Sequence, residues 1–395
     1  MPGFEIFGDE ERNEVQDVLN TGVLFRYGFD QARKGQWKVR DFEEELAKRL
    51  SVGHCLLCAS GTAALAIALA SCGIGAGDEV IVPPFTFIAT IESILSAGAV
   101  PVFAEIDETL CLDPEAVKAA ITPRSKAVIA VHMCGSMAQI DLIKQVCDEK
   151  GLILIEDACQ ALGATYKGQA VGTFGKIGCF SFDSVKTVTC GEGGAVVTPD
   201  KVVYKCAEQY ADHGHNHEGT DRGLEEHPIL GTNLRISELN AAVGLAQLRK
   251  LDMMLKTQRA NKEVLVEALS QFSEVSLQRI PDPAGDSATF LSFFLPDEER
   301  AREVAGNLEN AGVDGCFYWY DNNWHYFRQW QHLKNLESAA KLPLELLEEV
   351  PDYSTVNLPR SDRIMGRVIS MQIKLAWTQK DMETRISKIG EIFKK

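Results

Sequence analysis

The 395-residue sequence is short of positive charge, and it has no internal repeat and no low-complexity tract. Its 40 lysine and arginine residues stand against 56 aspartate and glutamate residues, which gives a formal net charge of −16. A chain of that sign repels nucleic acid and anionic lipid, so neither is expected as a partner. Ordinary proportions of hydrophobic (45%) and charged (24%) residues exclude a largely disordered or fibrous chain. The length predicts about two domains.

The first residues, MPGFEIFGDEERNEV, lack the basic segment and the apolar core of a secretory signal. Eleven cysteines is an odd number, and we expect a reduced protein located in the cytoplasm. Cys55 and Cys58 have the spacing of a zinc or redox pair, but no second pair completes a zinc site, so strand packing explains them better. Residues 56–74 carry no charge and are long enough to span a bilayer, yet their many small side chains favour a buried helix.

Short apolar runs alternate with helical patterns from Leu56 to about residue 200, which is typical of a doubly wound α/β sheet. Most of the runs are apolar nearly throughout, as strands covered on both faces are, and the expected strands are residues 79–82, 100–106, 127–132, 152–156, 177–181 and 195–198. Helices are expected between them, and three end at a glycine suited to a left-handed cap: residues 63–72, 90–97 and 140–150.

A polar loop rich in glycine and histidine, ADHGHNHEGTDRGLEEHPILG, follows this region and precedes one long helix expected from about Ser237 to Phe272. From residue 275 onward the sequence mixes short strands and helices, with turn signals at 281–286 and 295–300. We therefore expect a large domain at residues 1–255, which includes the N-terminal segment, and a smaller C-terminal α/β domain at residues 256–395. The long helix would link the two.

Histidines 213, 215 and 217 alternate in the way that metal ligands on one strand would. The glycines and the asparagine among them indicate a loop instead. We expect no metal site here, and we interpret the segment as a loop that covers substrate.

Three separate segments carry residue types that suit one chemistry. Lys186 lies between two apolar strand runs, Ser60-Gly61-Thr62 opens a helix, and Asp157 ends a strand. A helix N-terminus attracts phosphate, a carboxylate keeps a pyridine nitrogen protonated, and a lysine amine can hold an aldehyde and move a proton. Taken singly, each segment is equally compatible with a cap, a turn or a solvated lysine. Their order along the chain favours a site for pyridoxal 5'-phosphate.

With these motifs the sequence resembles the DegT/StrS family of pyridoxal-phosphate sugar aminotransferases over nearly its whole length. The similarity is densest in SGTAALAIAL, PPFTFIAT, IEDACQALGATYKGQAVG, the segment around Lys186, and GTNLRISELNAAVGLAQLRKLD. The resemblance implies an α/β fold of the aspartate aminotransferase type (fold type I), with a mostly parallel mixed sheet. It also implies a homodimer with shared active sites.

The resemblance assigns roles to particular residues. Lys186 is expected to be the Schiff-base lysine and Asp157 the partner of the pyridine nitrogen. The other expected cofactor contacts are Ser60, Gly61, Thr62 and Ser181 at the phosphate, Phe87 stacked on the ring, Gln160 at the phenolic oxygen, and Asn233 with Arg235 at the phosphate of the neighbouring subunit.

Three segments depart from the family's usual pattern at places expected to touch substrate: FRYGFDQARKGQWKVRDFEEEL, the histidine-rich loop, and DGCFYWYDNNWHYFRQW. Together they most resemble the 8-amino-3,8-dideoxy-manno-octulosonate transaminases. That resemblance implies a free eight-carbon sugar acid aminated at its terminal carbon, C8, with L-glutamate as donor, in lipopolysaccharide synthesis. A nucleotide-linked keto sugar is the alternative acceptor.

A free sugar acid requires cations that can meet its carboxylate, and Arg26, Arg33, Lys38 and Arg40 cluster in the unusual N-terminal segment. A solvated basic face is the alternative interpretation of each one. The aromatic segment offers flat faces and hydrogen bonds to a sugar. The expected substrate contacts are Arg26, Arg40, His215, Trp319, Trp324 and His325.

Other functions fit the sequence less well. Sugar dehydratases of the same family have histidine where this chain has Lys186. A cysteine desulfurase needs a thiol on a mobile loop, whereas Cys190 lies in the tight TCGEGG turn. A regulator that kept the fold without turnover is the alternative of another class.

Overall fold

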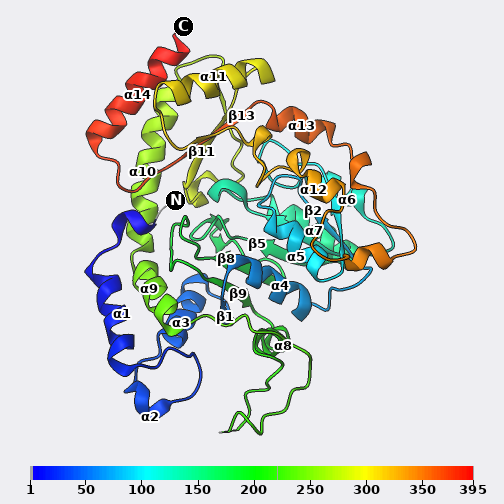
Figure 1. Cartoon of the computed structure of the whole chain (residues 1–395). Helices are drawn as coiled ribbons and strands as arrows, with labels where there is room; N and C mark the ends of the chain where they lie inside the picture. Colours follow the sequence, from blue (N-terminus) through cyan, green and yellow to red (C-terminus); the bar gives the residue numbers. More distant parts are fainter. Residues whose placement is uncertain (1–2, 220, 395) are drawn as a thin grey trace.

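Seven strands form the main sheet of the computed structural model, which describes residues 3–219 and 221–394 (Figure 1). In spatial order they are β1 (His54–Cys58), β9 (Gly194–Thr198), β8 (Ile177–Ser181), β5 (Ile153–Asp157), β4 (Ser125–Val131), β2 (Glu79–Val82) and β3 (Val100–Phe103). Strand β9 is antiparallel to both of its neighbours, and the other neighbouring pairs are parallel. The expected fold class and all six expected strands are confirmed, with ends shifted by at most a few residues.

Helices pack on this sheet as the glycine-terminated patterns predict. Helix α4 (Gly61–Ser71) contacts β8 and β9 and packs beside α5 (Ala89–Ser96) and α8 (Lys201–Ala211). Helix α6 (Pro114–Ala120) packs against α7 (Ile140–Lys150). The uncharged stretch 56–74 is therefore the end of β1 followed by the mostly buried helix α4, and no helix in the described part of the chain is long and apolar enough to cross a membrane.

The N-terminal segment packs against the start of the predicted long helix. It comprises the 3₁₀ turn η1 (Gly3–Ile6) and the helices α1 (Asp9–Thr21), α2 (Asp30–Arg33) and α3 (Lys38–Leu50). Helices α1 and α3 both contact α9 (Glu238–Arg249). The prediction of one continuous helix is wrong, because α9 and α10 (Leu251–Leu269) are separate. At the junction the Lys250 ammonium is held by Glu11 (2.8 Å) and by the carbonyl of Ile6 (3.1 Å), contacts that no local pattern reveals.

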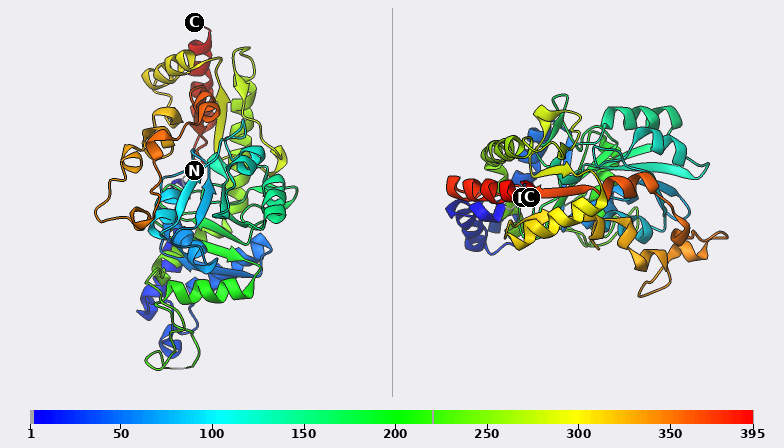
Figure 2. Two further views of the ribbon diagram at one scale, coloured as in Figure 1. Left: turned by 90° about the vertical axis from the view of Figure 1, so that its right-hand side faces the viewer. Right: turned by 90° about the horizontal axis from the view of Figure 1, so that it is seen from above.

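A smaller antiparallel sheet lies near the C-terminal end of the chain (Figure 1). Its strands, in spatial order, are β10 (Ser276–Leu277), β11 (Phe290–Phe294), β13 (Val368–Gln372) and β12 (Cys316–Phe317). A second hydrophobic core forms where α10, α11 (Glu298–Asn310) and α14 (Gln379–Phe393) pack with this sheet. Figure 2 shows the segment after α12 (Gln331–Lys334) standing out to one side before the chain returns through α13 (Pro359–Met365).

The carboxyl ends of the strands bring distant residues to one edge of the main sheet. Cys58 and Ser181 both pair with Gly194, and Asp157 pairs with Cys179. The segment after β12 crosses toward this edge, where Tyr326 forms a bridge with Phe85. Ligands of open α/β sheets bind at this edge, so the fold places a pocket where the sequence motifs converge.

Candidate active site

One cavity of about 450 Å³ collects most of the expected site residues. Its wall comes from the carboxyl edge of the main sheet, from the loop between β8 and β9, and from the segment after β12. The expected residues that line it are Ser60, Gly61, Thr62, Phe87, Asp157, Gln160, Ser181, Lys186, Trp319, Trp324 and His325.

The N-terminus of α4 opens into this cavity. The Ser60 side chain caps the helix by accepting the N–H of Ala63 (3.0 Å), and the N–H groups of a first helical turn have no partner within the helix. A Cβ on Gly61 would lie 2.8 Å from Cβ of Ser181, and a Cβ on Gly194 would lie 2.2 Å from the Ser60 carbonyl oxygen. The two glycines thus allow Ser181 and β9 to approach the helix end. Free backbone N–H groups, the hydroxyl groups of Thr62 and Ser181, and the helix dipole together make this end of α4 a suitable binding site for phosphate.

Asp157 lies at the end of β5 and is 5% exposed. One carboxylate oxygen accepts the hydroxyl of Thr90 (2.9 Å), and the other accepts the N–H of Cys159 (3.1 Å). A carboxylate has about four lone-pair sites, so acceptor capacity remains on the side that lines the cavity. This arrangement fits a protonated ring nitrogen.

Glu156, the residue before Asp157, is fully buried and anchors the strand end. It accepts three backbone N–H groups, from Gly172 (2.8 Å), Phe174 (2.6 Å) and Gly175 (2.7 Å). Nδ1 of His132 accepts a backbone N–H, so Nε2 carries the hydrogen that reaches Glu156 (3.0 Å). The backbone N–H of His132 also donates to the Asp157 carbonyl (3.0 Å). His132 is not among the residues expected from the sequence, since nothing local to it indicates this network.

Gln160 is oriented by a neighbouring backbone group. Its Oε1 accepts the N–H of Cys134 (3.1 Å), a residue in the left-handed region at φ 57°. Because a backbone N–H only donates, the amide oxygen must face it and the amide N–H groups remain for a ligand. Gln160 can therefore donate to a phenolic oxygen, as the resemblance implies.

The loop that carries Lys186 is held by backbone hydrogen bonds at the lysine and after it. The Lys186 carbonyl accepts the N–H of Gly3 (3.0 Å), and Asn240 donates to the carbonyls of Cys190 (3.0 Å) and Glu192 (3.1 Å). The Lys186 side chain lines the cavity. Burial raises the pKa of the Cys190 thiol, which makes that residue a poor nucleophile.

An aromatic wall faces the lysine. The backbone of residues 86–88 is bound to the segment after β12, through Thr86 N–H to the His325 carbonyl (3.0 Å) and Ile88 N–H to the Trp324 carbonyl (2.9 Å). The His325 ring lies 5.4 Å from Phe87 and 4.7 Å from Trp319, measured between ring centroids. Burial, and to a smaller extent the charge of Lys186, lowers the pKa of His325 to about 4.

The predicted arginine contacts lie outside this cavity. Arg26 is 8% exposed, and its guanidinium donates to Glu43 (2.9 Å) and to the Leu57 carbonyl (2.9 Å). Arg40 stacks on the ring of Trp37 (4.0 Å to the centroid). Among the described residues that line the cavity, Lys186 is the one basic side chain of the lysine or arginine type.

The loop after α8 also lies outside the cavity of its own chain and extends away from the main sheet at the lower end of Figure 1. In it Nδ1 of His215 lies 2.9 Å from Glu225. Arg235 forms an ion pair with the buried Asp212, and Asn233 accepts the backbone N–H of Arg235 (3.3 Å). No group of three or more potential metal ligands occurs in the part of the chain that the structure describes.

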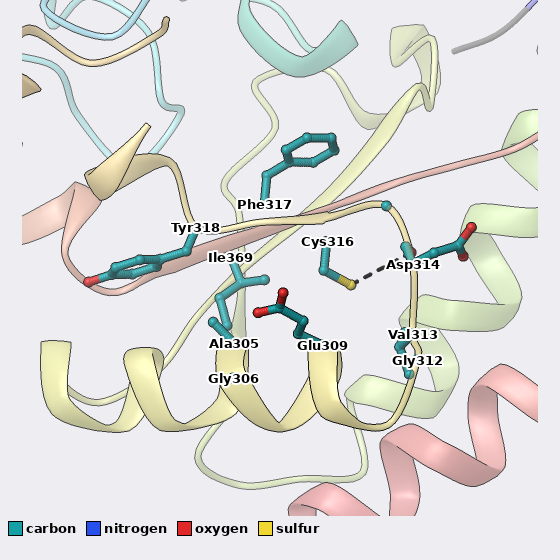
Figure 3. A pocket seen from close by; sticks show the side chains of 11 residues that line it. Ala305, Gly306, Glu309, Gly312, Val313, Asp314, Cys316, Phe317, Tyr318 and Ile369 are labelled. Carbon is teal, nitrogen blue, oxygen red and sulfur yellow. Dashed lines mark hydrogen bonds between the residues drawn. The ribbon is translucent and has the colours of Figure 1, made fainter. Parts of the chain in front are cut away.

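A second hollow, of about 490 Å³, lies between α11 and β12 (Figure 3). Figure 3 shows Cys316 pointing toward α11 and Phe317 pointing to the opposite side, as alternation along a strand requires. Phe317 also lines the first cavity. The described lining of the second hollow contains no basic side chain and none of the residues expected to act on the cofactor.

Comparison with known proteins agrees with this geometry. A family model described as the DegT/DnrJ/EryC1/StrS aminotransferase family matches residues 6–389. The chain is 40% identical to L-glutamine:2-deoxy-scyllo-inosose aminotransferase of Streptomyces kanamyceticus over 68% of this chain and 67% of that protein. It is 39% identical to GDP-perosamine synthase of Vibrio cholerae over 82% and 85%.

Solved structures show the same architecture. The aminotransferase from Psychrobacter cryohalolentis superimposes with a TM-score of 0.84 and 28% identity, covering 98% of this chain and 97% of that one. The crystal structure of 3-amino-5-hydroxybenzoic acid synthase gives a TM-score of 0.81 and 32% identity, covering 98% and 96%.

Proposed function

The chain belongs to the DegT/DnrJ/EryC1/StrS aminotransferase family, and we propose how its cavity carries out transamination and on which compound. The protein is a transaminase, and its cofactor is pyridoxal 5'-phosphate. The observation that carries the proposal is the convergence of Lys186, Asp157 and the α4 N-terminus on one cavity. Bound pyridoxal phosphate supplies the electron sink through which an amino group passes from a donor to a carbonyl compound.

Each of the site residues has its own proposed role. The N-terminus of α4, with Thr62 and Ser181, binds the phosphate. Asp157 holds a proton on the ring nitrogen, and Gln160 donates to the phenolic oxygen. Lys186 holds the cofactor and, once its amine is free, moves the proton between the reacting carbons. Phe87 stacks on the face of the ring.

The proposed acceptor is the C8 aldehyde of 3,8-dideoxy-8-oxo-manno-octulosonate, with L-glutamate as donor. Four aromatic residues of the unusual segment line the cavity, Phe317, Trp319, Trp324 and His325, and they offer flat faces and hydrogen bonds to a sugar. One relative is named for 2-deoxy-scyllo-inosose and the other for the synthesis of GDP-perosamine, so 2-deoxy-scyllo-inosose or a nucleotide-linked keto sugar is the rival acceptor.

The scarcity of cations in the cavity bears on this choice. A substrate carboxylate needs a basic partner, and the described wall of one chain offers Lys186 alone, which the cofactor occupies. We therefore propose a homodimer whose second subunit completes each site. We also propose that the protein is located in the cytoplasm, because its eleven cysteines are all unpaired. Asn233 and Arg235, which lie outside the cavity of their own chain, are the proposed contribution to the partner's phosphate.

The test has two stages. Borohydride reduction of the cofactor-saturated protein, followed by peptide mapping, is expected to label Lys186 and to lose that label in Lys186→Ala but not in Lys144→Ala, a change at an exposed ion pair. Attachment at another lysine contradicts the site, and the absence of a visible absorbance band supports a non-catalytic regulator.

The second stage identifies the acceptor. Enzyme in the aminated form is mixed with the octulosonate aldehyde, a nucleotide-linked 4-keto hexose, or 2-deoxy-scyllo-inosose, and the return of cofactor absorbance is timed. Fastest return with the eight-carbon acid is the expected result. A clear preference for either rival refutes the octulosonate assignment and leaves the transaminase assignment intact.

A further inference from the structure

Asn322 contacts His325 in a way that fixes the chemical form of the imidazole. Oδ1 of Asn322 accepts the backbone N–H of Trp324 (3.0 Å) and lies 2.9 Å from Nδ1 of His325. A backbone N–H can only donate, so this bond settles which end of the amide is oxygen. The same oxygen can only accept, and Nδ1 of His325 must therefore carry a hydrogen.

The surroundings of His325 keep the ring neutral. Phe87 and Trp319 flank it as uncharged aromatic rings, and the charged side chain that acts on it is Lys186, whose cationic form opposes a second positive charge. Burial acts in the same direction and lowers the pKa of His325. A neutral ring with hydrogen on Nδ1 has a bare Nε2.

Nε2 is available to a ligand. None of the described residues forms a hydrogen bond with Nε2. The atom is also not one of the fully buried side-chain atoms that lack a hydrogen-bond partner, so it is accessible. His325 lines the cavity together with Lys186 and Asp157. A hydrogen-bond acceptor without a partner therefore belongs to a residue of the cavity wall.

We propose that Asn322 is a positioning residue that holds His325 as the Nδ1–H tautomer, so that Nε2 accepts a hydrogen bond from a hydroxyl group of the substrate close to its reacting carbonyl. The inference rests on the proposed function only in requiring a hydroxylated acceptor. A neutral Nε2 favours hydroxyl donors and gives no attraction to a carboxylate, so it selects for the uncharged part of the acceptor.

The tautomer is tested without catalysis. Long-range ¹H–¹⁵N spectra of protein labelled in histidine, with the His325 signals assigned through their loss in His325→Gln, are expected to show hydrogen on Nδ1 at neutral pH. Asn322→Asp places a carboxylate at Nδ1 and is expected to yield an imidazolium with hydrogen on both nitrogens. Asn323→Ala, a change at the exposed neighbour, is the control and should leave the signals in place. Hydrogen on Nε2 in the unaltered protein overturns the proposal.

The role in recognition is tested with two small aldehydes. Enzyme in the aminated form is mixed with D-glyceraldehyde or with propanal, and the ratio of their second-order rate constants is compared among variants, which cancels differences in aldehyde hydration. One hydrogen bond to an otherwise unpaired group predicts that the preference for glyceraldehyde falls roughly tenfold in His325→Phe and stays unchanged in Asn323→Ala. Asn322→Asp is left out of this comparison, because the Nε2–H of an imidazolium can donate to the same hydroxyl oxygen.

The outcomes separate this inference from the proposed function. Loss of the preference together with rejection of the octulosonate aldehyde removes only the substrate assignment. An unchanged ratio in His325→Phe, or no reaction of the unaltered enzyme with either aldehyde, refutes the recognition role of Nε2.

Discussion

The capacity of Asp157 to bind the cofactor depends on the hydrogen bonds that its carboxylate forms within the protein. Its carboxylate keeps two internal hydrogen bonds, from Thr90 and Cys159, and still has acceptor capacity toward the cavity. We expect Asp157→Asn to weaken cofactor binding about 10- to 150-fold, the range of one lost charge-assisted hydrogen bond, and to slow turnover. Absorbance titration measures the binding.

The control for this prediction is Asp148→Asn at an exposed ion pair on α7, which should leave binding unchanged. Urea unfolding checks that the fold of Asp157→Asn persists. Unaltered affinity and rate in Asp157→Asn would show that the carboxylate only caps the strand end.

His325 makes stability depend on pH. Its pKa is about 4 in the folded chain, against an ordinary value of 6.5, so between these values the unfolded chain binds a proton that the folded chain does not. Stability is therefore expected to fall as pH drops from about 7 to about 4, with His325 contributing at most about 3 kcal/mol.

Urea unfolding of the unaltered protein and of His325→Gln across this range measures that contribution as a difference. As pH falls, the unaltered protein should lose stability relative to His325→Gln. A constant difference between pH 7 and pH 4 is incompatible with a neutral, buried His325.

Among the elements, the N-terminus of α4 depends on glycine at its first position. A Cβ on Gly61 would lie 2.8 Å from Cβ and 3.1 Å from Oγ of Ser181, so Ser181 has to move out of the phosphate cradle. We expect Gly61→Ala to lower cofactor affinity while the fold persists. Titration with pyridoxal phosphate and then with inorganic phosphate measures the loss.

Gly390→Ala in α14 is the matched control, because a Cβ added at Gly390 would meet nothing within 4 Å. It should bind cofactor normally and gain up to about 1 kcal/mol of helix stability. Equal affinities in the two variants would exclude the α4 N-terminus as the phosphate site.

Helix α10 illustrates how elements join the two sheets. Its first half contributes Met254 and Leu255 to the core of the main sheet, and its second half contributes Leu265 and Leu269 to the second core. We propose the domain boundary near residue 255 for this reason. Residues after the boundary also return to the first core, among them Trp319 and Trp330, so the smaller domain covers the cavity it helps to form.

In the molecule as a whole, the cavity of one chain lacks residues that the proposed function needs. We expect a mixture of Lys186→Ala and Asn233→Ala proteins to regain activity after subunit exchange, because a hybrid dimer with shared sites pairs one doubly damaged site with one undamaged site. Asn233 is the better choice for this change, since Arg235 neutralises the buried Asp212 and its loss would disturb the loop.

Activity per dimer and the exchanged fraction, from mass spectrometry of isotope-labelled subunits, are measured together. Recovery is expected to approach one quarter of unaltered activity at an equal mixing ratio, since about half of the dimers are hybrid. Exchange without recovery argues that each chain completes its own site.

The fold class, the strands of the main sheet and the motifs that converge on the cavity could all be predicted from the amino-acid sequence. Apolar runs ending in Asp157 or Ser181 predict parallel strands whose carboxyl ends meet, and Gly61 and Lys186 follow local patterns that a short window reveals. The signal is local in each case, because strand burial and helix capping act over a few residues.

Features that depend on distant partners emerge only in the folded chain. Folding places Arg26 against Glu43 rather than in the cavity, divides the predicted long helix at Lys250, and joins Glu156 to His132. Ion pairs and buried hydrogen bonds form between groups far apart in the chain, so no residue type or local spacing predicts them. The tautomer of His325 is also a feature that only the folded chain determines. It follows from the position of the Asn322 amide oxygen, which the tertiary structure sets.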